Sequence, residues 1–206
     1  MASLILDTSF NYLHLYLLDA TNQLMDGLSQ WCPKRQSESI MPQLQQLCMN
    51  NNINPECIDT VIVGDGPGSY TGLRIALTIA KVLAIEPNVK LGTLSSMDFI
   101  FGNNGTGYAI MDARSNRLYM AHYKDNVMDE LLSIVDKDAF INQYHKEESI
   151  WGEGSLIGFD DRYANLSNDL QAMLTRVCWV DHPFQLKPRY LKENDAYDPH
   201  KKSQTN

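Results

Sequence analysis

TVIVGDGPGSYTGLRIALTIAKVLAI, residues 60–85, carries the pattern from which the fold of this protein can be inferred. Its beginning, 60–64, is a continuous apolar run, which predicts a strand buried on both faces. The glycine-rich loop 64–72 leads into a helix at 73–85, and a second short strand follows at 89–96. Strand, helix and strand in this order form a crossover between parallel strands, which is nearly always right-handed.

Three further strands are predicted before this crossover. Residues 4–7 are apolar, residues 12–19 alternate between polar and apolar side chains, and residues 24–32 follow after another turn. Because the turns are short, the three strands must be antiparallel neighbours. A helix at 38–49 is predicted from apolar residues that recur every three or four positions. This order of elements is the ribonuclease-H-like layout, and we assign it to a first lobe at 1–101.

A second lobe is predicted after the turn-rich linker GNNGTG at 102–107. Within it, 108–123 has the pattern of a β-hairpin and 162–177 that of a helix. We assign 108–192 to this lobe, which makes it the smaller of the two. The polar residues 193–206 are expected to form a loose tail.

Composition and charge narrow the functional class. The chain has 206 residues, of which 44% are hydrophobic and 20% charged, an ordinary globular mix. It contains no apolar run near the roughly 20 residues that cross a bilayer, and no positively charged leader, so we expect a cytoplasmic protein that does not contact a membrane. The net charge of −8 argues against direct binding of nucleic acid, because such proteins present basic surface to phosphates.

Sequence spacing predicts no metal site and no nucleophile. The five histidines form no HxxxH pair, and the four cysteines share no CxxC spacing. The GxSxG motif of hydrolases is absent, and Ser69 is better placed to cap the following helix. We therefore expect no catalytic residue, and no cofactor bound by this chain alone.

The glycine-rich loop admits two interpretations. Glycines allow backbone amides to converge on a phosphate at a helix N-terminus, but they also allow a tight turn that binds nothing. The loop lacks the Lys-Ser/Thr pair of a Walker A motif, and its spacing favours neither interpretation. If a nucleotide binds, the candidate residues are Asp7, Thr8, Gly66, Gly68 and Ser69.

The helix after the loop has more apolar surface than one lobe can cover. Its polar residues Arg74, Thr78 and Lys81 form a narrow stripe, and apolar side chains occupy most other positions. A sheet covers one side of such a helix, so another helix or a second chain must cover the rest. We favour an exposed apolar patch that serves as a protein interface over complete burial within the lobe.

Five segments resemble the bacterial TsaB family, also called YeaZ. They are DTS (7–9), SESIMPQL (37–44), GDGPGSYTGLRIALTIAKVLA (64–84), YAIMDARSNRLYMAHY (108–123) and PRYLKE (188–193). The GPGSYTGLR block within the third segment is highly specific to that family. The chain departs from the family pattern at Gln36 and Lys192, where His and Arg are common, and matches it weakly at 124–187. The second lobe is therefore expected to be shortened.

The resemblance implies an α/β fold of the actin-like ATPase (ASKHA) superfamily, with two ribonuclease-H-like lobes built on mixed sheets. It also implies a non-catalytic relative of TsaD, the metal-binding enzyme that transfers a threonylcarbamoyl group to N6 of adenosine 37 in tRNA. Members of the family pair with TsaD through helices of the first lobe, the small ATPase TsaE joins the pair, and a free copy can form a homodimer. ATP, the metal ion and tRNA are then expected to be held by the partner subunits.

The partner surface implied by the resemblance consists of the helices at 38–49 and 71–85, packed on the equivalent helices of TsaD as a four-helix seam. A charge at Ala76 or Ala80 is expected to abolish pairing if small residues line the contact. The candidate contact residues are Ile40, Met41, Leu44, Leu47, Leu73, Ala76, Leu77, Ala80 and Leu83, with Arg74 as a polar contact at the rim.

Two alternatives from other functional classes remain open. One is an ASKHA-type phosphotransferase or hydrolase that binds ATP on its own, with phosphates beside Asp7, Thr8 and the loop 64–72. Stoichiometric binding of nucleotide by the isolated chain would favour it. The other is a peptidase-like activity, for which the sequence offers neither a metal pair nor a catalytic triad.

Overall fold

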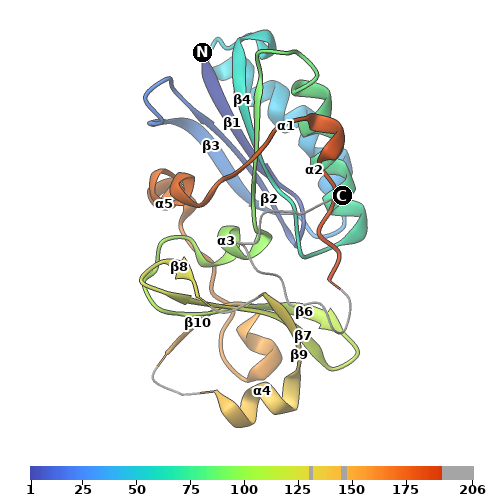
Figure 1. The fold of residues 1–206 in the computed structure, drawn as a ribbon, viewed down its shortest axis with the longest axis vertical. Helices are drawn as coiled ribbons and strands as arrows, with labels where there is room; N and C mark the ends of the chain where they lie inside the picture. Colours follow the sequence, from blue (N-terminus) through green and yellow to red (C-terminus); the bar gives the residue numbers. More distant parts are fainter. Residues whose placement is uncertain (130–131, 145–147, 192–206) are drawn as a thin grey trace. The chain divides into compact units, whose positions relative to one another are not determined.

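The computed structural model describes three stretches of the chain, residues 1–129, 132–144 and 148–191 (Figure 1). The chain divides into two compact units. The first contains Met1–Phe99 and Leu166–Arg189, and the second contains Ile100–Asn165 and, of the remaining described residues, Tyr190 and Leu191. The chain therefore leaves the first unit and later returns to it.

A six-stranded mixed sheet forms the first unit (Figure 1). Its strands are β1 (Ala2–Asp7), β2 (Tyr12–Leu18), β3 (Leu24–Trp31), β4 (Ile58–Gly64), β5 (Lys90–Leu94) and β11 (Cys178–Val180). They take the order β11-β5-β4-β1-β2-β3. β1, β2 and β3 are antiparallel in succession, while β1, β4 and β5 are parallel. Both the antiparallel triplet and the parallel crossover predicted from the sequence are confirmed.

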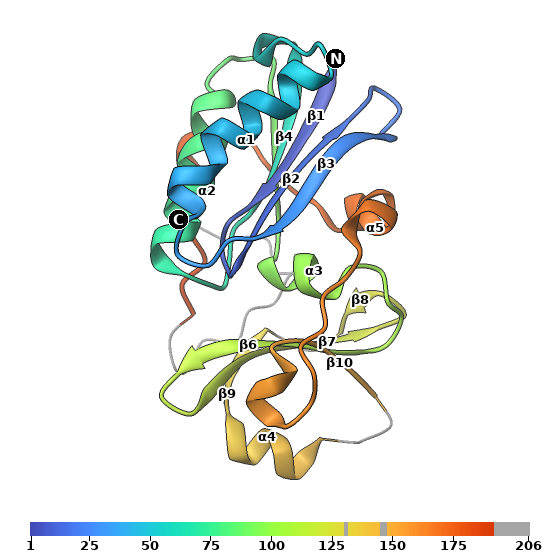
Figure 2. The same cartoon turned by 180° about the vertical axis from the view of Figure 1, so that it is seen from behind.

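Two helices, α1 (Gln36–Asn50) and α2 (Tyr70–Leu83), cover one face of this sheet (Figures 1 and 2). α1 buries Ile40, Leu44 and Leu47, whose spacing predicted the helix. These side chains join a core cluster with leucines of β1 and β2 and with the inner side of α2. Both helices are thus held to the sheet by the apolar side that their sequence pattern marks.

The last part of the predicted second lobe belongs to the first unit. α5 (Leu166–Met173) contacts β3, and β11 pairs antiparallel with β5 as an edge strand. The second lobe predicted at 108–192 therefore differs from the observed division, in which residues 166–189 belong to the first unit. The contacts responsible join residues far apart in the sequence. The helix predicted at 162–177 is shorter, and a 3-10 turn at Leu174–Arg176 follows it.

A smaller five-stranded sheet forms the second unit. Its strands are β6 (Gly107–Arg114), β7 (Arg117–Lys124), β8 (Val127–Met128), β9 (Ser133–Asp136) and β10 (Ser149–Gly152). β6 and β7 form the predicted hairpin, and β10 lies parallel to β6. α4 (Lys137–Gln143) contributes Phe140 to a core cluster with Ile110, Leu118 and Ile150. This small mixed sheet agrees with the prediction of a shortened second lobe.

The connecting and terminal parts contain little further regular structure. α3 (Ser96–Phe101) carries the chain from the first unit into the second, and 3-10 turns occur at Pro55–Cys57, Gly154–Ile157 and Pro183–Gln185. The predicted polar tail at 193–206 lies outside the described residues. Among the helices that the structure describes, none combines the length and the apolar character needed to span a membrane.

Candidate interaction surface

The glycine-rich loop holds the N-terminus of α2 against the turn that follows β1. Ser69 caps the helix, and its Oγ accepts a hydrogen bond from Gly72 N at 3.3 Å. Ser69 N donates to Ser9 O at 2.6 Å, and Thr8 Oγ1 donates to Gly72 O at 2.7 Å. A Cβ atom on Gly72 would lie only 1.9 Å from Thr8 O, so this close approach of helix and turn requires glycine.

The candidate nucleotide-binding residues form hydrogen bonds within the chain or lie buried in it. Asp7 and Thr8 are fully buried, and Asp7 accepts hydrogen bonds from the backbone and hydroxyl of Ser9 at 3.1 and 2.8 Å. Burial raises the pKa of Asp7 to about 7, against the opposing effect of the bonds from Ser9. Gly66 is buried and Gly68 is half-buried. The burial of the Asp7 and Thr8 side chains supports the tight-turn interpretation, and their contact with phosphate stays a prediction.

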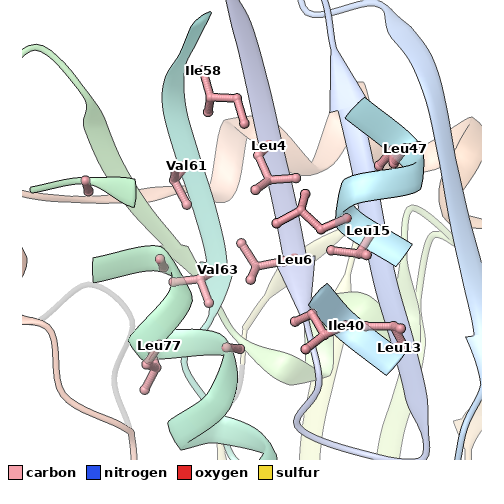
Figure 3. Close-up of a cluster of buried hydrophobic side chains, with 14 of the residues drawn as sticks. Leu4, Leu6, Leu13, Leu15, Ile40, Leu47, Ile58, Val61, Val63 and Leu77 are labelled. Carbon is pink, nitrogen blue, oxygen red and sulfur yellow. The ribbon is translucent and has the colours of Figure 1, made fainter. Parts of the chain in front are cut away.

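Seven of the predicted interface residues lie in the core of their own unit. Their side chains are at most 7% exposed, and Figure 3 shows Ile40 next to Leu6 and Leu13 of the sheet. The prediction that these residues contact a partner is wrong, because the first unit itself already covers them. The two alanines are completely buried on α2, which packs against β4. The seven are Ile40, Leu44, Leu47, Leu73, Ala76, Leu77 and Ala80.

Other positions of the two helices expose apolar side chains. On α1, Met41 is 55% and Met49 64% exposed. On α2, Tyr70 is 59% and Val82 63% exposed, and Ile85, just beyond the helix, is 64% exposed. The predicted surplus of apolar surface on α2 is therefore confirmed, but other residues than the alanines carry it. We call Met41, Met49, Tyr70, Arg74, Val82 and Ile85 the outer face.

A groove of about 510 Å³ lies along α2 and includes Tyr70 and Arg74 of the outer face. Arg74 lies over the Tyr70 ring, with its guanidinium carbon 5.1 Å from the ring centre, and donates a hydrogen bond to the Tyr70 hydroxyl. Of the predicted contacts, Met41 and Arg74 are exposed and Leu83 is half-buried, so these three remain available to a partner. The groove is lined by Tyr70, Thr71, Arg74, Ile75, Thr78 and Ile79.

The sequence reasoning missed Tyr70, Val82 and Ile85. The signal that could have found them was the polar stripe on the same helix. Tyr70 and Val82 lie four residues before Arg74 and four after Thr78, which places all four on one side of α2. Since Arg74 and Thr78 mark the solvent side, the apolar residues between and beside them are exposed.

Titratable side chains of the second unit pair with one another. His122 lies between two carboxylates, with Nδ1 2.6 Å from Asp129 Oδ1 and Nε2 3.2 Å from Glu148 Oε2. In the part of the chain that the structure describes, no three His, Cys, Asp or Glu side chains come together in a way that could hold a metal ion.

Comparison with known sequences connects the chain to tRNA modification proteins. A family model described as TsaD, tRNA N6-adenosine threonylcarbamoyltransferase, matches residues 30–151. The tRNA threonylcarbamoyladenosine biosynthesis protein TsaB of Bacillus subtilis is 29% identical over 138 residues, which cover 64% of this chain and 60% of that protein. The Escherichia coli protein of the same name is 32% identical over 99 residues, 45% of this chain and 43% of that protein. The chain thus spans about half the length of these two relatives.

A relative of similar length comes from Mycoplasma pneumoniae. This uncharacterized protein is 32% identical over 192 residues, covering 92% of the present chain and 94% of its own. The alignment therefore includes the shortened second unit as well as the first.

Solved structures share the fold at low sequence identity. A crystal structure of an uncharacterized Pseudomonas aeruginosa protein, described as similar to peptidase YeaZ, has a TM-score of 0.72 at 16% identity and covers 93% of this chain and 99% of its own. YeaZ from the same organism has a TM-score of 0.67 at 17% identity, with 92% and 99% covered. The α/β fold of the actin-like ATPase superfamily, expected from the sequence, agrees with these neighbours. Because the family model matches more than half of the chain and relatives named TsaB and YeaZ accompany it, this protein belongs to the TsaB (YeaZ) family.

Proposed function

We propose that this chain is a non-catalytic scaffold subunit of the complex that synthesises N6-threonylcarbamoyladenosine at position 37 of tRNA, and that it pairs with and supports the catalytic subunit TsaD. The observation that carries this proposal is the outer face, where apolar side chains of α1 and α2 stay exposed although both helices have filled their own core. The names of the Bacillus subtilis and Escherichia coli relatives support the assignment to this pathway.

In this proposal the outer face contacts TsaD, and the buried sides of α1 and α2 hold that face rigid against the sheet. Burial of an exposed valine or isoleucine contributes about 1.5–3 kcal/mol of association free energy before the costs of binding are counted. Val82, Ile85 and the two methionines therefore act as apolar anchors, and Arg74, beside Tyr70 on α2, acts as a polar contact. In this proposal, a free copy of the chain pairs with a second copy through the same surface. TsaD then replaces that second copy.

The chemistry of the complex enters with the partner subunits. In this proposal TsaD holds the metal ion and the tRNA, and the ATPase TsaE brings ATP to the pair. The net charge of −8 supports this division of roles, because a subunit that gripped tRNA itself would need basic surface to neutralise phosphates.

The test is size-exclusion chromatography with light scattering on the chain alone and mixed with TsaD of the same organism. We expect a complex of one copy of each, lost on Val82→Glu. Ile141→Glu is the matched control. Like Val82, Ile141 is an exposed, β-branched apolar residue on a helix, but its helix, α4, lies in the second unit. A well-folded wild-type chain that does not bind TsaD would refute the proposal, as would equal loss of binding in both variants.

A further inference from the structure

The chain makes a last contact with the first unit after β11. Residues 186–189, which we call the C-terminal strap, begin with Leu186, a residue that is 4% exposed and belongs to the core cluster of the first unit. The strap ends at Arg189, next to the glycine-rich loop between β4 and α2. Buried leucine and charged arginine thus tie the strap at both of its ends.

Arg189 binds the loop through its backbone and its side chain. Arg189 N donates to Asp65 O at 2.7 Å, and Arg189 Nη2 donates to Asp65 Oδ2, also at 2.7 Å. Both side chains are largely covered, with 16% of the arginine and 8% of the aspartate exposed. A Cβ atom on Gly66, whose φ is +123°, would lie 2.7 Å from Arg189 O, so the strap lies directly on the loop. The ion pair is therefore shielded from solvent and geometrically constrained.

The same loop leads directly into α2. On its far side, Ser69 N is bonded to Ser9 O and Thr8 Oγ1 to Gly72 O, as described above. The loop is thus held by the turn after β1 and by the strap, and also by the start of α3, where Ser96 N donates to Gly66 O at 2.9 Å. Tyr70, the first residue of α2 and a member of the outer face, follows the loop immediately.

We propose that Arg189 is a positioning residue, which holds the loop between β4 and α2 and so sets the position of the first turn of α2 and of Tyr70 on the outer face. The inference rests on the proposed function for the role of the outer face, but its structural part concerns this chain alone. Removal of the Arg189 side chain takes nothing away from the outer face. It removes the ion pair with Asp65 and leaves the backbone bond from Arg189 N to Asp65 O in place.

The test compares Arg189→Ala with Arg176→Ala. Arg176 forms a similar buried ion pair with Asp98 at 3.4 Å, with 13% and 7% of the two side chains exposed, and it also lies in the C-terminal part of the first unit. Neither Arg176 nor Asp98 belongs to the loop. Asp98 is connected to it through Ser95, whose backbone N donates to Asp98 and whose Oγ donates to Gly66 O at 3.2 Å. We expect amide hydrogen exchange at Ser69, Gly72 and Leu73 to be about tenfold faster in Arg189→Ala, and unchanged in Arg176→Ala at matched stability.

A conservative variant guards against general unfolding. Arg189→Lys keeps the charge but not the fork of donors, so exchange at the same amides is expected to lie between wild type and Arg189→Ala. Faster exchange across the whole first unit, or equal exchange in the 189 and 176 variants, would overturn the inference.

Affinity for TsaD supplies a second readout. We expect Arg189→Ala to weaken the complex about tenfold and Arg176→Ala to leave it unchanged. Faster exchange at the α2 amides together with wild-type affinity would overturn the link between the strap and the outer face. If wild type itself does not bind TsaD, the proposed function fails, and the exchange data alone decide whether Arg189 positions α2.

Discussion

Ala76 and Val82 lie six residues apart on α2 and face opposite environments. Ala76 is completely buried, while Val82 exposes 63% of its surface. Six residues turn the helix by about 240°, enough to bring one side chain to the sheet and the other to solvent. The helix is therefore apolar on both sides. Its Ala76 side packs within the first unit, and its Val82 side belongs to the surface that we propose for a partner.

A charge at Ala76 is expected to unfold the first unit rather than to remove a partner contact. Ala76→Asp places a carboxylate in a closely packed apolar environment, at a cost of about 3 kcal/mol or more. Chemical denaturation of the isolated chain measures this loss. Thr78→Asp, on the exposed side of the same helix, should change stability by no more than about 0.5 kcal/mol. Equal stability of the two variants would contradict the burial described for Ala76.

Asp7 is expected to make the folded chain less stable as pH rises. Its pKa is raised by burial from 3.8 to about 7. Between these values the unfolded chain releases the proton while the folded chain keeps it, so the unfolded state binds fewer protons and stability falls with pH. The loss attributable to Asp7 is up to about 4 kcal/mol between pH 4 and pH 8.

Asp7→Asn removes this titration while preserving shape. Urea denaturation at pH 4.5 and pH 8 should show a smaller loss of stability in the variant than in wild type. The remaining dependence includes Asp65, whose pKa burial raises to about 6 although Arg189 opposes the shift. Parallel pH profiles for wild type and Asp7→Asn would show that Asp7 stays ionised in the fold.

Gly72→Ala is expected to destabilise the protein even though alanine favours helices. Helix propensity alone predicts a gain of about 1 kcal/mol. The added Cβ would lie 1.9 Å from Thr8 O, which forces α2 away from the turn after β1 and costs about 2 kcal/mol net. Thermal denaturation gives the sign directly, and a higher melting temperature than wild type would exclude the close approach.

Tyr70→Ala is expected to weaken binding to TsaD about tenfold with little change in stability. Tyr70 is exposed and supports Arg74 at the groove, and aromatic residues of this kind often dominate interfaces. Titration calorimetry measures the affinity. Met25→Ala is the control, since Met25 is 41% exposed on β3 of the same unit and belongs neither to the groove nor to the outer face. Equal effects of the two substitutions would remove Tyr70 from the interface.

Much of the fold could be predicted because patterns among residues close together in the sequence indicate its elements. The apolar run of β4, the glycine-rich loop and the spacing of Ile40, Leu44 and Leu47 each indicate one element, and the order of elements restricts the sheet topology. The hairpin of β6 and β7 was recognisable for the same reason. The return of α5 and β11 to the first unit was not, because the pairing of Cys178 with Thr93 leaves no local signature.

The candidate interaction surface could likewise be predicted only in part. Periodicity in the sequence was enough to establish that α2 carries more apolar surface than one sheet can cover. It could not distinguish the alanines from Val82 and Ile85, because a helix that is apolar all round has no unique inner side until a sheet packs against it. The use of the glycines likewise depended on Thr8 and Arg189, which approach the loop from distant parts of the chain. Local sequence thus specified the elements and their apolar content, whereas contacts over long sequence separations decided which apolar side chains stayed exposed.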